Sequence, residues 1–193
     1  MNGHYELLYH QVRQTGVKEA EWRPFEQGTR LLQAAPGERI IEAGQQVRNA
    51  YFCTTGLFRL YYTLADGREY NVVFTVAPDF ATAYAAVITG EPAAYSIESM
   101  EHSTVIEIPS LVLQSLMDCC RGWERYVRRS LERLYIRKEE RERELLYLTA
   151  KERYDVFHLK YPGLAARIPQ YHIASYLGIS PVSLSRLLRQ EGH

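Results

Sequence analysis

The C-terminal segment IASYLGISPVSLSRLLR, residues 173–189, brings hydroxyl and guanidinium groups together in a short stretch. Serine and arginine side chains donate hydrogen bonds to phosphate oxygens and to base edges, and small apolar side chains pack on thymine methyl groups. The candidate nucleic-acid contacts are Ser180, Pro181, Val182, Ser183, Ser185, Arg186 and Arg189, with Arg167 ahead of the segment. Such groups can recognise DNA only if one exposed helix face presents them together.

The spacing of the other residues in this segment predicts two helices around a tight turn. Ala174 falls where two helices cross closely, and Gly178 falls where a left-handed backbone is needed. Ser180 and Pro181 then form a typical helix start. The apolar residues that would pack the pair are Ile173, Leu177, Ile179, Leu184 and Leu187. This register is that of a helix-turn-helix, whose second helix enters the major groove; the alternative is a helical hairpin with no nucleic-acid role.

Charge is distributed unevenly along the 193 residues, although the net charge is zero. Residues 1–120 carry 8 Lys+Arg and 14 Asp+Glu, whereas residues 121–193 carry 15 and 9. A basic C-terminal third indicates a polyanionic partner, unless the basic residues only decorate a solvated helix. The chain lacks an apolar run of membrane-spanning length and a signal peptide, and its three cysteines do not suit a disulfide framework. We therefore expect a cytoplasmic protein that does not bind membranes.

The order of elements predicts an α+β fold in three parts. Apolar positions such as Leu31 and Leu32 suggest helix over residues 1–34, and glycine-punctuated β-branched and aromatic runs then indicate an antiparallel β-roll. Asp66-Gly67 is expected to form a two-residue primed turn with positive φ at both positions. The predicted parts are a sensor-like domain over 1–120, a long helix over 121–148 and a helix-turn-helix domain over 149–193. Within the last part, Thr149–Glu152 is a capping box that starts a new helix.

Apolar residues step along the predicted long helix by threes and fours, the spacing of a coiled-coil face. The candidate dimer seam is Val127, Leu131, Leu134 and Leu145. The alternative is that these side chains pack on the chain's own strand domain.

Three segments carry a resemblance to the Crp–Fnr family of bacterial transcription regulators: PGERIIEAGQQVRNAYFCTTGLFRLYY, DGREYNVVFTVAPDF and RIPQYHIASYLGISPVSLSRLLR. The resemblance implies a homodimer with a jelly-roll-like, cyclic-nucleotide-binding-like domain, paired long helices and terminal DNA-binding domains. It also implies that Arg186 occupies the position at which family members commonly have an arginine that contacts a guanine base. RNA polymerase is a further candidate partner. Because the chain stops at His193, the family's β wing is expected to be missing, and phosphate contacts must come from the serines and arginines named above.

The segment that would hold a cyclic phosphate departs from the family's pattern. Thr82-Ala83 and Ala93-Ala94 occupy the positions of the family's glutamate and arginine-serine pair, and residues 78–99 contain no Lys or Arg. A buried phosphate needs charge-assisted donors, so a cyclic nucleotide is not expected unless Arg59 or Arg68 reaches the site. A pocket for a small apolar or aromatic effector would be lined by Tyr61, Tyr70, Phe74, Thr82, Tyr84, Ala93 and Tyr95. Alternatively, these rings fill the roll and no effector exists.

Other classes of function find less support in the sequence. The histidines and cysteines show neither the clustering of a metal site nor the number needed for an iron–sulfur cluster, so we expect no cofactor. No nucleophile–base pair indicates an enzyme. An effector-binding signalling module whose terminal helices contact a protein remains the alternative to a DNA-binding regulator.

Overall fold

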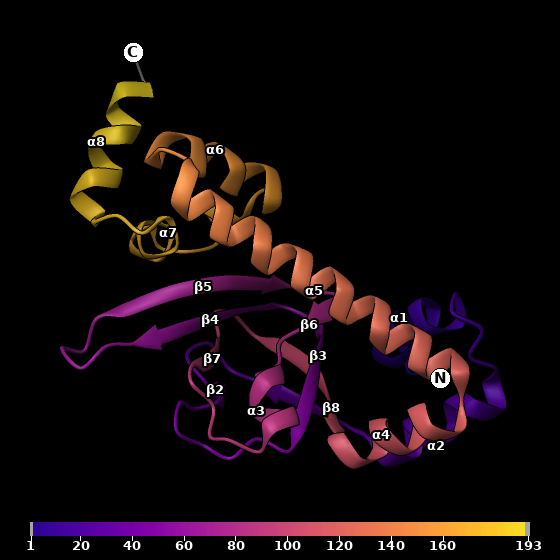
Figure 1. The fold of residues 1–193 in the computed structure, drawn as a ribbon. Coiled ribbons are helices and arrows are strands. Elements are labelled where there is room, and N and C mark those ends of the chain that lie inside the picture. The colour runs from indigo at the N-terminus through magenta and orange to yellow at the C-terminus, as the bar shows by residue number, and fades with distance from the viewer. Residues whose placement is uncertain (1, 192–193) are drawn as a thin grey trace.

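The computed structural model describes residues 2–191, which form a roll of strands, a long helix and a C-terminal group of helices (Figure 1). The strands are β1 (Arg30–Ala34), β2 (Arg39–Ile41), β3 (Asn49–Thr55), β4 (Leu57–Thr63), β5 (Glu69–Val76), β6 (Asp79–Phe80), β7 (Ser96–Ser99) and β8 (Ser103–Pro109). The helices are α1 (Gly3–Arg13), α2 (Glu19–Gly28), α3 (Tyr84–Thr89), α4 (Ser110–Cys119), α5 (Arg121–Tyr147), α6 (Ala150–Lys160), α7 (Gln170–Leu177) and α8 (Pro181–Glu191), with a 3-10 turn at Leu164–Ala166. The predicted α+β class is confirmed.

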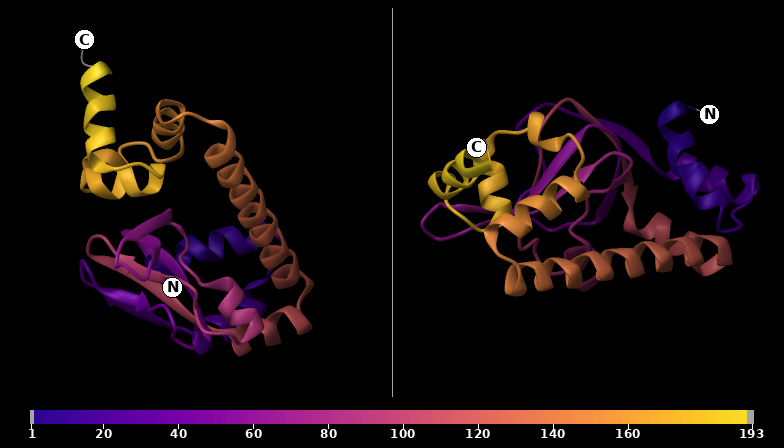
Figure 2. Two further views of the ribbon diagram at one scale, coloured as in Figure 1. Left: turned by 60° about the vertical axis from the view of Figure 1, so that its left-hand side comes forward. Right: turned by 90° about the horizontal axis from the view of Figure 1, so that it is seen from above.

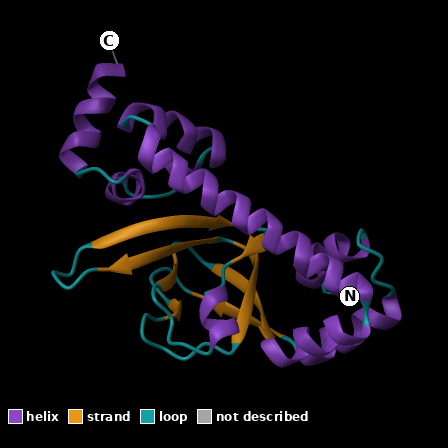
Figure 3. Cartoon of the chain, viewed as in Figure 1, coloured by secondary structure: helices purple, strands orange, loops and turns teal. Residues whose placement is uncertain are grey.

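Two four-stranded antiparallel sheets build the roll (Figure 3). Their strand orders are β1-β8-β3-β6 and β2-β7-β4-β5, and β4 pairs with β5 along its whole length. The prediction of helix through residue 34 is wrong at its end, because Leu31 and Leu32 lie in β1 and pair with Ile106 and Val105 of β8. A partner strand more than seventy residues away thus overrides the local helical pattern.

The hairpin between β4 and β5 has a longer turn than predicted. Gly67 has φ of +81°, but no residue other than glycine has positive φ among the described residues, so Asp66 does not. Leu64 N–H donates to the Arg68 carbonyl, and Gly67 N–H donates to the Leu64 carbonyl, both at 2.9 Å. The longer loop follows the twist of the two strands with a single left-handed glycine. Asp66 therefore does not have to adopt the strained left-handed conformation that a two-residue primed turn would require.

Helix α5 begins in an aromatic cluster that joins the N-terminal helices to the roll. The indole rings of Trp22 and Trp123 stack with their centroids 5.9 Å apart, and Phe25 and Tyr126 surround them. Gly122 lets the helix approach the chain after α1, because a Cβ there would lie 2.8 Å from the Val17 nitrogen. From this cluster α5 runs past the roll to the C-terminal helices (Figure 2). Among the described residues no helix is both long and apolar enough to cross a membrane.

The capping box predicted between α5 and α6 is present. Thr149 N–H donates to Glu152 Oε2 (2.8 Å), and Glu152 N–H donates to Thr149 Oγ1 (3.3 Å). Arg153 joins the ends of two other helices, since its guanidinium donates to the carbonyls of Leu148 (2.5 Å) and Leu177 (2.9 Å). The break after α5 is therefore fixed by side chains on the first turn of α6.

Replacing Thr149 with alanine removes the hydroxyl acceptor from the start of α6. We expect Thr149→Ala to lower the free energy of unfolding by about 1 kcal/mol, the usual cost of losing an N-cap. Urea denaturation followed by circular dichroism measures this loss. Thr149→Ser keeps the hydroxyl and should stay close to wild type; an equal loss in both variants would show that the hydroxyl does not cap the helix.

Candidate functional site

Helices α7 and α8 form a helix pair with a left-handed residue at the turn. Gly178 has φ of +70° and ψ of +30°, and Ile179 N–H donates back to the Ala174 carbonyl at 3.0 Å. A side chain at Gly178 would be strained in this conformation. Ala174 and Leu184 are fully buried between the helices. The residues packed in or against this C-terminal cluster include Ile173, Leu177, Ile179 and, in place of the predicted Leu187, Leu188.

The polar side chains predicted to contact DNA lie at the start and along the outer face of α8. Ser180 Oγ accepts a hydrogen bond from Ser183 N–H (3.1 Å), which caps the helix. Val182 is 60% exposed, and Arg186 is also exposed. Ser180, Pro181, Ser183 and Arg189 are exposed too, and Ser185 is half-buried. Within residues 2–191, neither Arg186 nor Arg189 has an ion pair, so both guanidiniums are available to a partner.

Arg167 differs from the other predicted DNA contacts. Its guanidinium pairs with Glu101, at the turn between β7 and β8, through Nη2 to Oε1 (2.6 Å) and Nε to Oε2 (3.3 Å). This bidentate pair ties the segment before α7 to the roll. Arg167 is thus engaged within the chain instead of being free for a phosphate. The expected absence of a wing concerns the chain end at His193, which lies outside the described residues.

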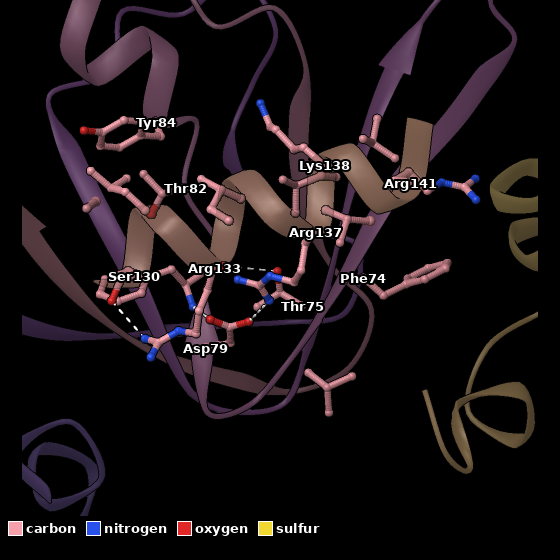
Figure 4. A pocket seen from close by; sticks show the side chains of 18 of the residues that line it. Phe74, Thr75, Asp79, Thr82, Tyr84, Ser130, Arg133, Arg137, Lys138 and Arg141 are labelled. Carbon is pink, nitrogen blue, oxygen red and sulfur yellow. Dashed lines mark hydrogen bonds and ion pairs between the residues drawn. The ribbon is translucent and has the colours of Figure 1, made fainter. Parts of the chain in front are cut away.

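A cavity of about 880 Å³ lies between the roll and α5 (Figure 4). Phe74, Thr82, Tyr84 and Tyr95 of the predicted pocket line it. From the roll it also includes Leu60, Tyr62, Val73, Val76, Ala77, Phe80 and Ala85; from α5 it includes Val127, Leu131, Leu134, Lys138, Arg141 and Leu145. Tyr161 and Tyr176 extend the lining to the C-terminal helices, so the cavity touches all three parts of the fold.

Three residues predicted for the pocket do not line it, which corrects that prediction. Alternate residues of β4 face opposite ways: Leu60 and Tyr62 face the cavity, whereas Tyr61 donates to Glu98 (3.2 Å) on the other face. Tyr70 is 38% exposed beside the hairpin turn, and Ala93 is buried in the core of the roll. Because both faces of β4 carry apolar and aromatic residues, alternation in the sequence did not indicate which face meets the cavity.

Among the described residues, no Lys or Arg side chain of the roll lines the cavity. The Lys and Arg side chains that line it are Arg133, Arg137, Lys138, Arg141 and Lys160, all from α5 and α6. Arg59 faces the opposite side of β4 and pairs with Glu69 (2.5 Å) and Glu98 (3.0 Å), and Arg68 pairs with Asp66 (2.7 Å). The hydroxyl of Thr82 exchanges hydrogen bonds with the Tyr51 backbone. Neither of the two arginines considered for a phosphate is therefore available.

The predicted seam residues lie on one flank of α5. Val127 packs against the aromatic cluster, and Leu131 and Leu134 are half-buried beside the cavity, so part of the seam contacts the chain's own roll. Leu145 is 48% exposed. Sequence reasoning missed the exposed apolar residues Tyr135 (68%) and Leu146 (73%), although Tyr135 lies one turn after Leu131.

Helix α7 is docked on β5 through a buried polar network. Asn71 N–H donates to Ser175 Oγ (2.9 Å), and Ser175 Oγ donates to the Glu69 carbonyl (2.8 Å). Asn71 Nδ2 donates to the His172 carbonyl (3.0 Å) and lies 3.2 Å from His172 Nδ1. Arg59 Nη1 lies 3.5 Å from the same ring nitrogen. Burial, followed by the charge of Arg59, lowers the pKa of His172 to about 4, so the imidazole is neutral and accepts at Nδ1.

Residues 31–119 match the family model of the cyclic nucleotide-binding domain. No curated protein sequence matches the chain. Among solved structures, FixK2 from Bradyrhizobium japonicum superposes with a TM-score of 0.73 at 21% identity, covering 84% of this chain and 83% of FixK2. A protein of Eubacterium rectale assigned to the Crp–Fnr transcriptional regulators has a TM-score of 0.74 at 16% identity, covering 90% and 83%. The chain has the Crp–Fnr fold. The c-di-GMP-responsive regulator CLP of Xanthomonas campestris shares this fold, with a TM-score of 0.73 at 15% identity over 91% of this chain and 92% of CLP.

The Crp–Fnr fold explains why the cavity, α5 and the helix pair meet. Residues 31–119 span the roll from β1 to the end of α4, and the roll supplies one wall of the cavity. The other wall is α5, which continues to the helix pair.

Proposed function

We propose that the chain is a homodimeric, cytoplasmic transcription regulator that binds specific DNA sequences and catalyses no reaction. The observation that carries the proposal is the outer face of α8, where Arg186 and Arg189 are exposed and unpaired within the described residues. A guanidinium in the major groove donates two hydrogen bonds to guanine O6 and N7, and a capped helix start directs N–H groups toward a phosphate. We assign Arg186 to a guanine and Ser180 and Ser183 to the backbone.

The proposed homodimer is formed by α5. Leu131, Leu134 and Leu145 supply its apolar spacing, and Tyr135 and Leu146 are exposed beside them. A second copy of the helix would cover these side chains and place two recognition helices about a two-fold axis. We retain 1–120 as the sensor part, 121–148 as the dimer helix and 149–193 as the DNA-binding part. RNA polymerase is the proposed partner of the DNA-bound form.

The test is selection of bound sequences from a random duplex pool by wild type and Arg186→Ala. Wild type should enrich a palindrome with half-site centres about one helical turn, roughly 34 Å, apart. The variant should lose a guanine from each half-site, because the bidentate contact contributes about 1–3 kcal/mol of discrimination. Arg143→Ala removes an exposed arginine of α5 and should select the wild-type sequence.

Two results would contradict the proposal. One is the absence of any enriched sequence even at low salt, where phosphate contacts are strongest. In that case the terminal helices contact a protein, as in the alternative signalling module. The other is an unchanged palindrome in Arg186→Ala, which would remove Arg186 from base recognition.

A further inference from the structure

An aliphatic side chain lies on the same face of α8 as the two unpaired arginines. Val182, Arg186 and Arg189 are spaced by four and three residues, which places them along one stripe of the helix. All three are exposed, and 60% of Val182 is accessible. Leu184 and Leu188 pack into the C-terminal cluster on the opposite side of the helix. A partner that covers the arginines of this stripe therefore covers Val182 as well.

Val182 lies at the end of α8 that would enter a major groove first. It is the second residue of the helix, directly after Pro181. Figure 1 shows α8 at the edge of the molecule, beyond α6 and α7, where neither the roll nor α5 covers it. In a helix-turn-helix the N-terminal residues of the second helix contact base edges. The position of Val182 is thus one from which a side chain reads bases.

The serines of this first turn lie beside the stripe instead of on it. Successive helical residues are about 100° apart around the axis, so Ser183 points to one side of Val182. Ser180 Oγ accepts a hydrogen bond from Ser183 N–H (3.1 Å), and the two hydroxyl oxygens lie 2.9 Å apart. These hydroxyls suit the backbone contacts proposed above. Val182 is left as the side chain that faces the bases one turn before Arg186.

An isopropyl group distinguishes bases by one feature of the major groove. Thymine alone among the four ordinary bases presents a methyl group there, on C5, and 5-methylcytosine carries the same group at the same ring position. Placing Val182 against the amino group of cytosine or O6 of guanine would remove water from a polar atom without replacing its hydrogen bond, which is costly. Contact with a C5 methyl group instead takes two apolar surfaces out of water.

We propose that Val182 reads the C5 methyl group of a pyrimidine, so that each half-site carries thymine or 5-methylcytosine close to the guanine assigned to Arg186. The inference rests on the proposed function, because it specifies a base that the same helix recognises. Four residues span about 6 Å along a helix axis. Since base pairs follow one another at about 3.4 Å, the methyl group lies within two base pairs of the guanine.

The experiment measures the Kd of the full chain for duplexes built on the sequence that wild type selects. At each pyrimidine within two base pairs of the guanine, the duplexes carry thymine or uracil, or 5-methylcytosine or cytosine, so that each pair differs by one methyl group. Wild type should bind the methylated member about fourfold more tightly for one half-site and about fifteenfold for both, the ratio that corresponds to burying one methyl group in each. Fluorescence anisotropy with labelled duplexes gives both Kd values.

Three variants show whether the ratio depends on Val182. Val182→Ala removes most of the aliphatic surface and should lower each ratio toward one, whereas Val182→Ile should keep the preference for the methyl group. Leu111→Ala is the matched control, because Leu111 is the second residue of α4 on the roll and is 77% exposed. It should keep the wild-type ratios. Each ratio compares two duplexes on one protein, so a change in stability cancels.

Two outcomes would overturn the inference: equal affinity of wild type for both members of every pair, or unchanged ratios in Val182→Ala. A preference confined to one pair would support it and would identify the base that Val182 reads. The selection itself scores the proposed function. If no duplex is selected even at low salt, the regulator and the methyl contact are both rejected, whereas a selected duplex without a methyl effect rejects only the role of Val182.

Discussion

Phe157→Ala will lower the free energy of unfolding by about 3–5 kcal/mol, the cost of removing a large buried ring from a core. Phe157 is fully buried on α6, where its ring meets Phe74 of β5 with centroids 6.2 Å apart and Tyr176 of α7 at 5.6 Å. The same ring therefore packs against the roll and against the helix pair. We expect the loss to loosen the attachment of α7 to β5 as well as to destabilise the chain.

Urea denaturation monitored by circular dichroism measures the effect of Phe157→Ala. Leu159→Ala is the matched control, since Leu159 lies two residues away on α6 and is 80% exposed. Exposed substitutions usually change stability by less than about 0.5 kcal/mol. Similar losses in the two variants would mean that the C-terminal cluster does not hold the helix pair to the roll.

Acid should destabilise the folded chain through His172, whose folded pKa of about 4 lies below the ordinary value of 6.5. The charged groups that face it are Arg59, which lowers its pKa, and Glu69, which raises it less. Between pH 6.5 and 4 the unfolded chain binds a proton at this site that the folded chain does not. Stability present above pH 6.5 is therefore lost as the pH falls toward 4, by about 2 kcal/mol at pH 5.

The measurement is the free energy of unfolding at pH 7.5 and pH 5 for wild type and His172→Asn. The asparagine does not titrate, so this variant should lose about 2 kcal/mol less than wild type over the interval. His102→Asn, at an exposed position of the roll, should keep the full loss. If His172→Asn and wild type have the same pH dependence, the imidazole is not neutral in the fold.

Local signals in the sequence predicted the helical parts of the fold well. The left-handed turn at Gly178, the cap at Ser180 and the box at Thr149 and Glu152 each depend on residues within a few positions of one another. The predicted long helix differs from α5 by a single residue at its end. Such signals need no knowledge of distant partners.

Tertiary pairing explains what the sequence did not predict. The strand at Leu31 and Leu32 depends on β8, and the docking of α7 depends on Asn71 meeting His172 across 101 residues. The shift in register between Leu60 and Tyr61 in the β4–β5 pair also has no local signature. Of the predicted pocket, Phe74, Thr82, Tyr84 and Tyr95 line the cavity, whereas Tyr61 lies on the opposite face of its strand.

The alternation along β4 allows the side chains on the two surfaces of one strand to be substituted independently. Substitutions at Leu60 or Tyr62 reshape the cavity wall, while Arg59 and Tyr61 keep their contacts on the side that carries the helix pair. Because neighbouring positions of β4 contact different parts of the molecule, the shape of the cavity wall can change without altering the attachment of α7 to the roll. The shape of the cavity and the docking of the C-terminal helices are thus encoded by interleaved, separable sets of residues on one strand.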